Sequence, residues 1–76
     1  MPDAWLDAGE ENCARLIGLI AQALDELAPG QTLGVAAYDP GAPFDIRAWC
    51  HMTGHQLLSA TVEASRMEFV IEKTAS

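Results

Sequence analysis

The sequence is poor in positive charge. Four lysine and arginine residues stand against 11 acidic residues, which gives a formal net charge of −7 over 76 residues. A surface of this sign repels the phosphate backbone of nucleic acids, so we do not expect direct nucleic-acid binding. The same charge favours association with basic patches on a protein partner.

Long apolar segments are also missing. The longest run, residues 16–21, is interrupted by Gly18 and is much shorter than the ~18 residues that a membrane span needs. The first five residues, Met-Pro-Asp-Ala-Trp, lack the basic region and apolar segment of a signal peptide. We therefore expect a cytoplasmic protein that does not bind membranes.

Cysteine is scarce, with only Cys13 and Cys50. In a cytoplasmic chain we expect both thiols to be free rather than joined in a disulfide. Two cysteines cannot form a four-cysteine zinc site, and their spacing from His51 and His55 matches no familiar metal-binding motif. Nucleotide-binding motifs are missing as well, so the sequence predicts neither a metal nor a cofactor.

The residues that are present predict a folded protein, because half of them are hydrophobic. The length predicts a single domain over residues 1–76, near the lower limit for folding on a core alone, and we expect a monomer. Periodicity and turn residues predict six elements: strand 4–8, helix 13–27, strand 32–38, helix 43–53, strand 56–63 and strand 66–73. This βαβαββ order predicts an α/β two-layer sandwich, with a mixed four-stranded sheet and both helices on one face.

Each element has an apolar pattern that predicts its buried side. We expect the first helix to bury Ile17, Ile20, Leu24 and Leu27, with Leu16 and Ala23 beside them, and the second to bury Ile46, Trp49, Cys50 and Thr53. In the last two strands, we expect Leu58, Ala60, Val62, Met67, Phe69 and Ile71 to alternate inward, and Val35 to join the core from the second strand. On the opposite side of the second strand, the small residues Gly34 and Ala36 predict a crowded or covered face.

Cys13 is the most informative residue of the sequence. Asn12 is a good N-cap for the first predicted helix, because its side-chain oxygen can accept a free amide of the first turn. Cys13 would then stand at the first helical position, where the helix dipole favours the thiolate over the thiol. This position predicts sulfur chemistry.

Several segments of the chain resemble the TusA/SirA-like family of sulfur carriers. The resemblance rests on Leu-Asp-Ala…Asn-Cys at 6–13, Leu-Asp-Glu-Leu-Ala-Pro-Gly-Gln-Thr-Leu at 24–33, Asp-Pro-Gly-Ala at 39–42, Asp-Ile-Arg-Ala-Trp-Cys-His-Met-Thr-Gly-His at 45–55 and Met-Glu-Phe-Val-Ile-Glu-Lys at 67–73. It implies the same βαβαββ sandwich and a carrier that holds sulfane sulfur as a persulfide on Cys13. It also implies a sulfur-donor protein, such as a cysteine desulfurase or a rhodanese, and a sulfur-acceptor protein. The family serves tRNA thiolation, molybdenum-cofactor assembly or sulfur oxidation.

The chain departs from the family at its hallmark motif. Where the family has Cys-Pro-x-Pro, this sequence has Cys-Ala-Arg-Leu at 13–16, and the preceding glycine, Gly9, stands one place early. The missing prolines leave open a second interpretation, a non-catalytic interaction or regulatory module of a sulfur-transfer complex. A thiol redox sensor is a third and weaker interpretation, because no resolving cysteine stands near Cys13.

The remaining candidate residues have plainer interpretations. Cys50 lies on the apolar side of its helix and is predicted to be a core thiol. His51 and His55 are expected to be solvated or to cap the second helix. Glu10 and Glu11 are expected to form a solvated loop, with a docking role beside Cys13 as the alternative.

Overall fold

Six elements follow one another in the order βαβαββ, as the sequence predicts. The computed structural model describes residues 2–9, 13–63 and 66–74, and it describes residues 13 and 14 by their backbone alone. The elements are β1 (Ala4–Asp7), α1 (Cys13–Asp25), β2 (Thr32–Ala37), α2 (Ala42–Thr53), β3 (Gln56–Val62) and β4 (Met67–Glu72). Every predicted element is therefore confirmed, and each boundary lies within two residues of its predicted place.

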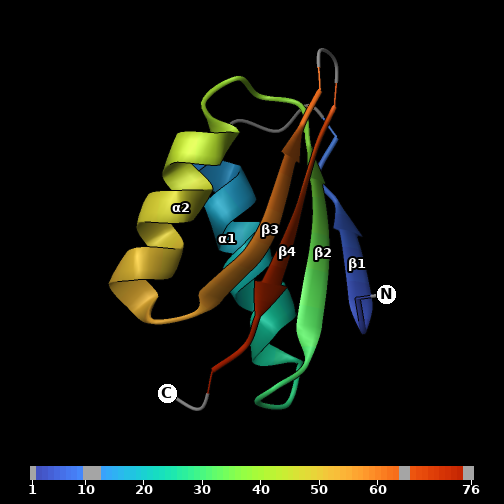
Figure 1. Cartoon of the computed structure of the whole chain (residues 1–76), viewed down its shortest axis with the longest axis vertical. Helices are drawn as coiled ribbons and strands as arrows, with labels where there is room; N and C mark the ends of the chain where they lie inside the picture. Colours follow the sequence, from blue (N-terminus) through green and yellow to red (C-terminus); the bar gives the residue numbers. More distant parts are fainter. Residues whose placement is uncertain (1, 10–12, 64–65, 75–76) are drawn as a thin grey trace.

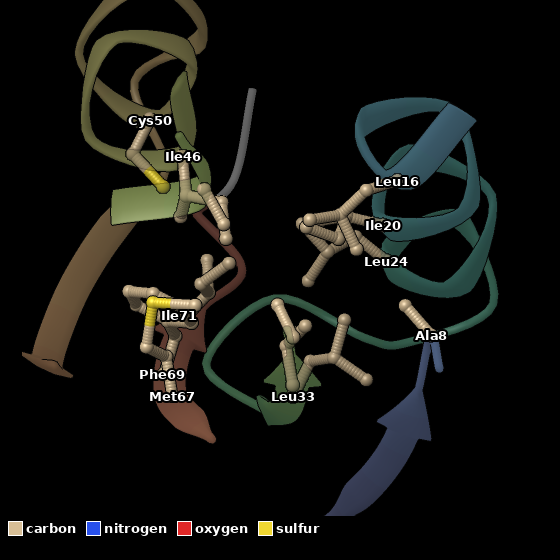
Figure 2. Packing of buried hydrophobic residues seen from close by; sticks show 13 residues of the cluster. Ala8, Leu16, Ile20, Leu24, Leu33, Ile46, Cys50, Met67, Phe69 and Ile71 are labelled. Carbon is tan, nitrogen blue, oxygen red and sulfur yellow. The ribbon is translucent and has the colours of Figure 1, made fainter. Parts of the chain in front are cut away.

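The four strands form one mixed sheet in the order β1-β2-β4-β3. β1 runs parallel to β2, whereas β4 runs antiparallel to both β2 and β3. Both helices pack on the same face of this sheet (Figure 1), so the predicted two-layer sandwich is confirmed. α1 covers the β1–β2 half and α2 covers the β4–β3 half (Figure 2).

The core lies between the two helices and the sheet. Figure 2 shows side chains of both helices pointing toward those of the strands. The large, fully buried residues of the core are Phe69, Leu16, Ile20, Leu24, Leu33, Ile46, Ile71 and Val35. Of the residues expected in the core, Ile20, Leu24, Val35, Ile46, Phe69 and Ile71 are fully buried, whereas Trp49 is partly buried and packs against the cluster.

Both helices differ from the predicted burial in detail. In α1, Ile20 and Leu24 are buried as predicted, but the first member of the buried stripe is Leu16, whereas Ile17 is only partly buried. In α2, the prediction that Thr53 is buried is wrong, because Thr53 is exposed and its hydroxyl donates to the carbonyl oxygen of Trp49 at 2.8 Å. A threonine in the last turn of a helix can bond back to the preceding turn in this way without needing burial.

β3 is the strand whose predicted pattern is partly wrong. Leu58 is 51% exposed, and Leu57 packs against the core in its place. The cause is a bulge between Leu57 and Ser59, which shifts the pairing by one residue. Beyond the bulge, Ala60 and Val62 pair with the buried Phe69 and Met67, but both are themselves exposed, Val62 by 61%, because β3 is an edge strand of the sheet. The prediction that Ala60 and Val62 are buried is therefore wrong.

On the face of the sheet without helices, the side chain of Trp5 from β1 lies across the neighbouring strand β2. Trp5 pairs with Gly34 on β2, and a side chain at position 34 would overlap the Trp5 ring and Pro2. The small residue at position 34 is therefore needed for the indole to lie across the strand. This agrees with the predicted crowding of that face.

Candidate functional site

The start of α1 is the candidate site, and the turn after β1 leads to it. The carboxylate of Asp7 accepts the amide hydrogen of Gly9 at 2.9 Å, and Gly9 has φ of 59°. This left-handed conformation favours glycine, so Gly9 provides the turn one place earlier than the family pattern. The amide of Ala8 donates to the carbonyl oxygen of Ala36 at 3.1 Å, which ties the end of β1 to β2 just before the turn.

α1 begins at Cys13, as the sequence predicts. At this position the first amides of the helix have no partner within the helix, and they create a positive potential at its N-terminus. The proposed N-cap Asn12 and the acidic pair Glu10 and Glu11 lie outside the described residues, as does the thiol of Cys13. What the structure contributes is the position of the backbone: a helix N-terminus just beyond the carboxyl ends of the two parallel strands, β1 and β2.

Cys50 is in a contrasting environment. It is a free thiol, only 3% exposed, in the core between α2 and the sheet. Burial disfavours the charged thiolate and raises the pKa of Cys50 from 9.0 to about 11. The prediction of a structural core thiol is confirmed.

The two histidines lie at the C-terminal end of α2. His51 is exposed, whereas the ring of His55 lies 5.4 Å from that of Trp49 and its Nδ1 accepts the amide hydrogen of Thr74 at 3.3 Å. The helix end is closed by Gly54, whose amide donates to the carbonyl oxygen of Cys50 at 3.0 Å with φ of 86°. The C-cap is therefore formed by Gly54, and His55 contacts the tryptophan instead. Among the residues that the structure describes, no three histidine, cysteine or acidic side chains gather in a way that could hold a metal ion.

The structure also contains an apolar groove that the sequence analysis missed. It has a volume of about 440 Å³ and lies between the start of α2 and the end of the β3–β4 hairpin. Its main lining residues are Tyr38, Pro43, Phe44, Arg47, Val62 and Met67. The signal that could have revealed it is Phe44, a large apolar residue beside Asp45 on the side of α2 that faces away from its buried stripe.

The starts of α1 and α2 and the β3–β4 hairpin lie at the same end of the molecule (Figure 1), and the groove is lined by residues at the start of α2 and in the hairpin. Asp7 and Ala36, near the carboxyl ends of β1 and β2, are paired, and Ala37 pairs with Met67 at the start of β4. Met67 in turn pairs with Val62 at the end of β3. The register therefore brings the hairpin to the same end of the sheet as the carboxyl ends of β1 and β2. The chain leads from these two strand ends to the starts of α1 and α2.

These features define a small α/β sandwich with a cysteine at the N-terminus of its first helix. Comparison with known proteins agrees with this class, because the family model "Sulfurtransferase TusA" matches residues 5–73. A protein of Pseudomonas putida named "Sulfur carrier protein TusA" is 38% identical over 74 residues, covering 97% of this chain and 92% of the relative. A protein of Pseudomonas paraeruginosa with the same name is 37% identical over 73 residues, covering 96% and 92%.

A third relative, YrkI of Bacillus subtilis, is 41% identical over 71 residues, covering 93% of this chain and 95% of the relative. The chain belongs to the TusA sulfurtransferase family. Of the helices in the part of the chain that the structure describes, none is long and apolar enough to cross a membrane.

Proposed function

We propose that the protein is a cytoplasmic sulfur carrier of one domain, with Cys13 as the carrier residue. The observation that supports this most strongly is the position of Cys13, at the first residue of α1 in a chain of the TusA family. Relatives that match nearly the whole chain are named sulfur carrier proteins. The helix dipole at this position stabilises a thiolate, which is the nucleophilic form of cysteine.

The proposed transfer consists of two thiol–disulfide exchanges. The Cys13 thiolate attacks the terminal sulfur of a donor's cysteine persulfide, a new S–S bond forms on Cys13, and the donor cysteine leaves as a thiolate. A thiolate of the acceptor protein then attacks the terminal sulfur on Cys13 and releases the Cys13 thiolate. Sulfane sulfur is passed on without net oxidation or reduction, so the cycle needs no cofactor and no dedicated base once the thiolate exists.

The proposed partners are proteins on both sides of the exchange. The donor is a cysteine desulfurase or a rhodanese carrying a persulfide, and the acceptor serves tRNA thiolation, molybdenum-cofactor assembly or sulfur oxidation. The net charge of −7 supports partners with basic surfaces and argues against direct contact with the tRNA itself.

A second candidate function is a regulatory or docking module that no longer carries sulfur. The observation that favours it is the replacement of both hallmark prolines by Ala14 and Leu16. Proline at the second helical position fixes φ before folding, so its loss leaves the start of the helix less rigid. In this alternative, the protein binds a sulfur-transfer complex while Cys13 remains unloaded.

Intact-mass measurement after incubation with a cysteine desulfurase and cysteine distinguishes the two functions. We expect one added sulfur that a reducing agent removes. Cys13→Ser should abolish the addition, whereas Cys50→Ala should retain it because Cys50 is buried as a thiol. If no desulfurase or rhodanese loads the wild-type chain, but Ala14→Pro restores loading, the module is the correct function.

A further inference from the structure

We propose that the apolar groove at the start of α2 binds the cysteine-bearing segment of the protein that exchanges sulfur with Cys13, through an apolar side chain flanked by lysine or arginine. The inference rests on the proposed function, since it assigns the docking surface of the same site. It is based on the exposed apolar residues of the groove, its position and the charges around it.

Two large apolar side chains of the groove are left to solvent. Phe44 is 76% exposed and Val62 is 61% exposed, and both line the groove together with the buried Met67. They come from separate elements, α2 and β3, so the apolar surface is continuous across the fold rather than a single stray side chain. Apolar patches of this kind, with a polar rim, mark surfaces that another molecule covers.

The position of the groove suits a partner that must reach Cys13. The starts of α1 and α2 and the β3–β4 hairpin all lie at one end of the molecule (Figure 1). The bond from the amide of Glu63 to the carbonyl oxygen of Arg66, at 3.1 Å, closes the hairpin. A protein segment anchored in the groove therefore approaches the same end at which α1 begins. An anchor of this kind limits the number of orientations in which the two cysteines can meet.

The charges around the groove specify the chemistry of this segment. Glu63 lines the groove, Asp45 is exposed on the first turn of α2, and Asp39 precedes the same helix. Arg47 is the cation of the lining, whereas Arg66 is directed to Glu68 at 3.2 Å and to the ring of Trp5 at 6.0 Å. The surroundings are thus predominantly acidic on a chain of net charge −7, which favours a basic segment and disfavours an anionic metabolite.

The test compares two exposed apolar residues of the same helix. Phe44 lies in the groove, whereas Met52 is 81% exposed near the C-terminal end of α2 and is the matched control. Binding is measured with purified cysteine desulfurase and with purified rhodanese as probes, by calorimetry, in a Cys13→Ser background. Because this background cannot transfer sulfur, a failure of the carrier function does not affect the result.

We expect Phe44→Ala to weaken binding to at least one of the two probes about tenfold or more, and Met52→Ala to change it less than twofold. Raising the salt concentration should weaken binding further, since the complex is charge-complementary. Chains labelled with ¹³C at the methionine methyl groups provide a direct readout. The signal of Met67 in the groove should shift on titration, while that of Met52 should not.

Four results would overturn the inference. The first is that neither probe binds saturably, and the second is that Phe44→Ala binds the probes with the same affinity as the wild type. The third is that Met52→Ala loses as much affinity as Phe44→Ala, and the fourth is that the Met67 signal does not shift on titration. A wild-type dimer that Phe44→Ala converts to a monomer in sedimentation would show that a second copy of this chain occupies the groove, and it would also contradict the proposal.

Discussion

The two cysteines of this chain stand in settings that affect a thiol in opposite ways. Cys13 begins α1, where the unpartnered amides of the first turn favour negative charge. Cys50 is enclosed by the core, where burial raises its pKa to about 11, so that it is protonated at neutral pH. A thiol in that state neither attacks a persulfide nor binds a metal. At the scale of the residue, therefore, the fold leaves Cys13 as the candidate for sulfur transfer.

The raised pKa of Cys50 predicts a loss of stability at alkaline pH. Below about pH 8 the thiol is almost fully protonated in both the folded and the unfolded chain, so its contribution to stability is nearly constant. Between the unfolded value of 9.0 and the folded value of about 11, the unfolded chain releases this proton while the folded chain keeps it. Unfolding thus becomes more favourable as the pH rises through this window, by about 1–2 kcal/mol near pH 10.5.

Urea unfolding of the wild type and of Cys50→Ala checks this prediction. The variant should be less stable at about pH 8, because the substitution leaves a small cavity. Its further loss of stability between about pH 8 and about pH 10.5 should be smaller than that of the wild type. Equal losses of stability in the two proteins would mean that the pKa of Cys50 is the same in the folded and the unfolded chain.

At the scale of the element, sequence patterns predicted the two helices and four strands well because each periodicity is determined by local spacing. The alternation of Met67, Phe69 and Ile71 is confirmed in β4, and the turn residues Pro43 and Gly54 mark the two ends of α2. Leu58 is exposed rather than buried, contrary to the prediction, because of the bulge in β3. A bulge depends on pairing with a distant strand, so alternation within the strand carries no sign of it.

The groove could not be predicted for a related reason. Phe44 and Val62 are 18 positions apart and on different elements, and they share a surface only after the sheet register places the hairpin beside the start of α2. The sequence does point to Cys13, because an N-terminal helical position is a local property. The start of α1 at Cys13 is confirmed, whereas its role as a carrier stays a prediction.

The start of α1 supplies a test of the missing prolines. Ala14 is the second residue of the helix, where an amide has no partner within the helix, so Ala14→Pro removes no helical hydrogen bond. We expect this variant to be as stable as the wild type, or more stable by about 0.4–1 kcal/mol, and to load sulfur at the same rate or faster.

Leu16→Pro is the contrasting variant. Leu16 is completely buried in the core, so its replacement should lower the free energy of unfolding by about 2–5 kcal/mol. Urea unfolding and the initial rate of loading from a cysteine desulfurase measure both effects. A strongly destabilised Ala14→Pro would show that the amide of Ala14 has a partner that matters to the fold.

At the scale of the whole molecule, the start of α1, the start of α2 and the β3–β4 hairpin lie at the same end of the sheet (Figure 1). The opposite end holds the C-terminus of α2, which Gly54 caps, and the nearby contact between Trp49 and His55 (Figure 1). A carrier needs a reactive group and a surface that partners recognise, and this arrangement provides positions for both at the same end. Under the proposed function, we expect the net charge of −7 to favour partners with basic surfaces.

The central claim is that sulfane sulfur resides on Cys13, and locating it in the wild-type chain tests this claim most directly. The protein is incubated with a cysteine desulfurase and cysteine, alkylated, digested and analysed by tandem mass spectrometry. We predict an additional sulfur on the peptide that contains Cys13, lost after reduction, and none on the peptide that contains Cys50. Sulfur on Cys50, or on neither peptide with every donor tested, would contradict the account.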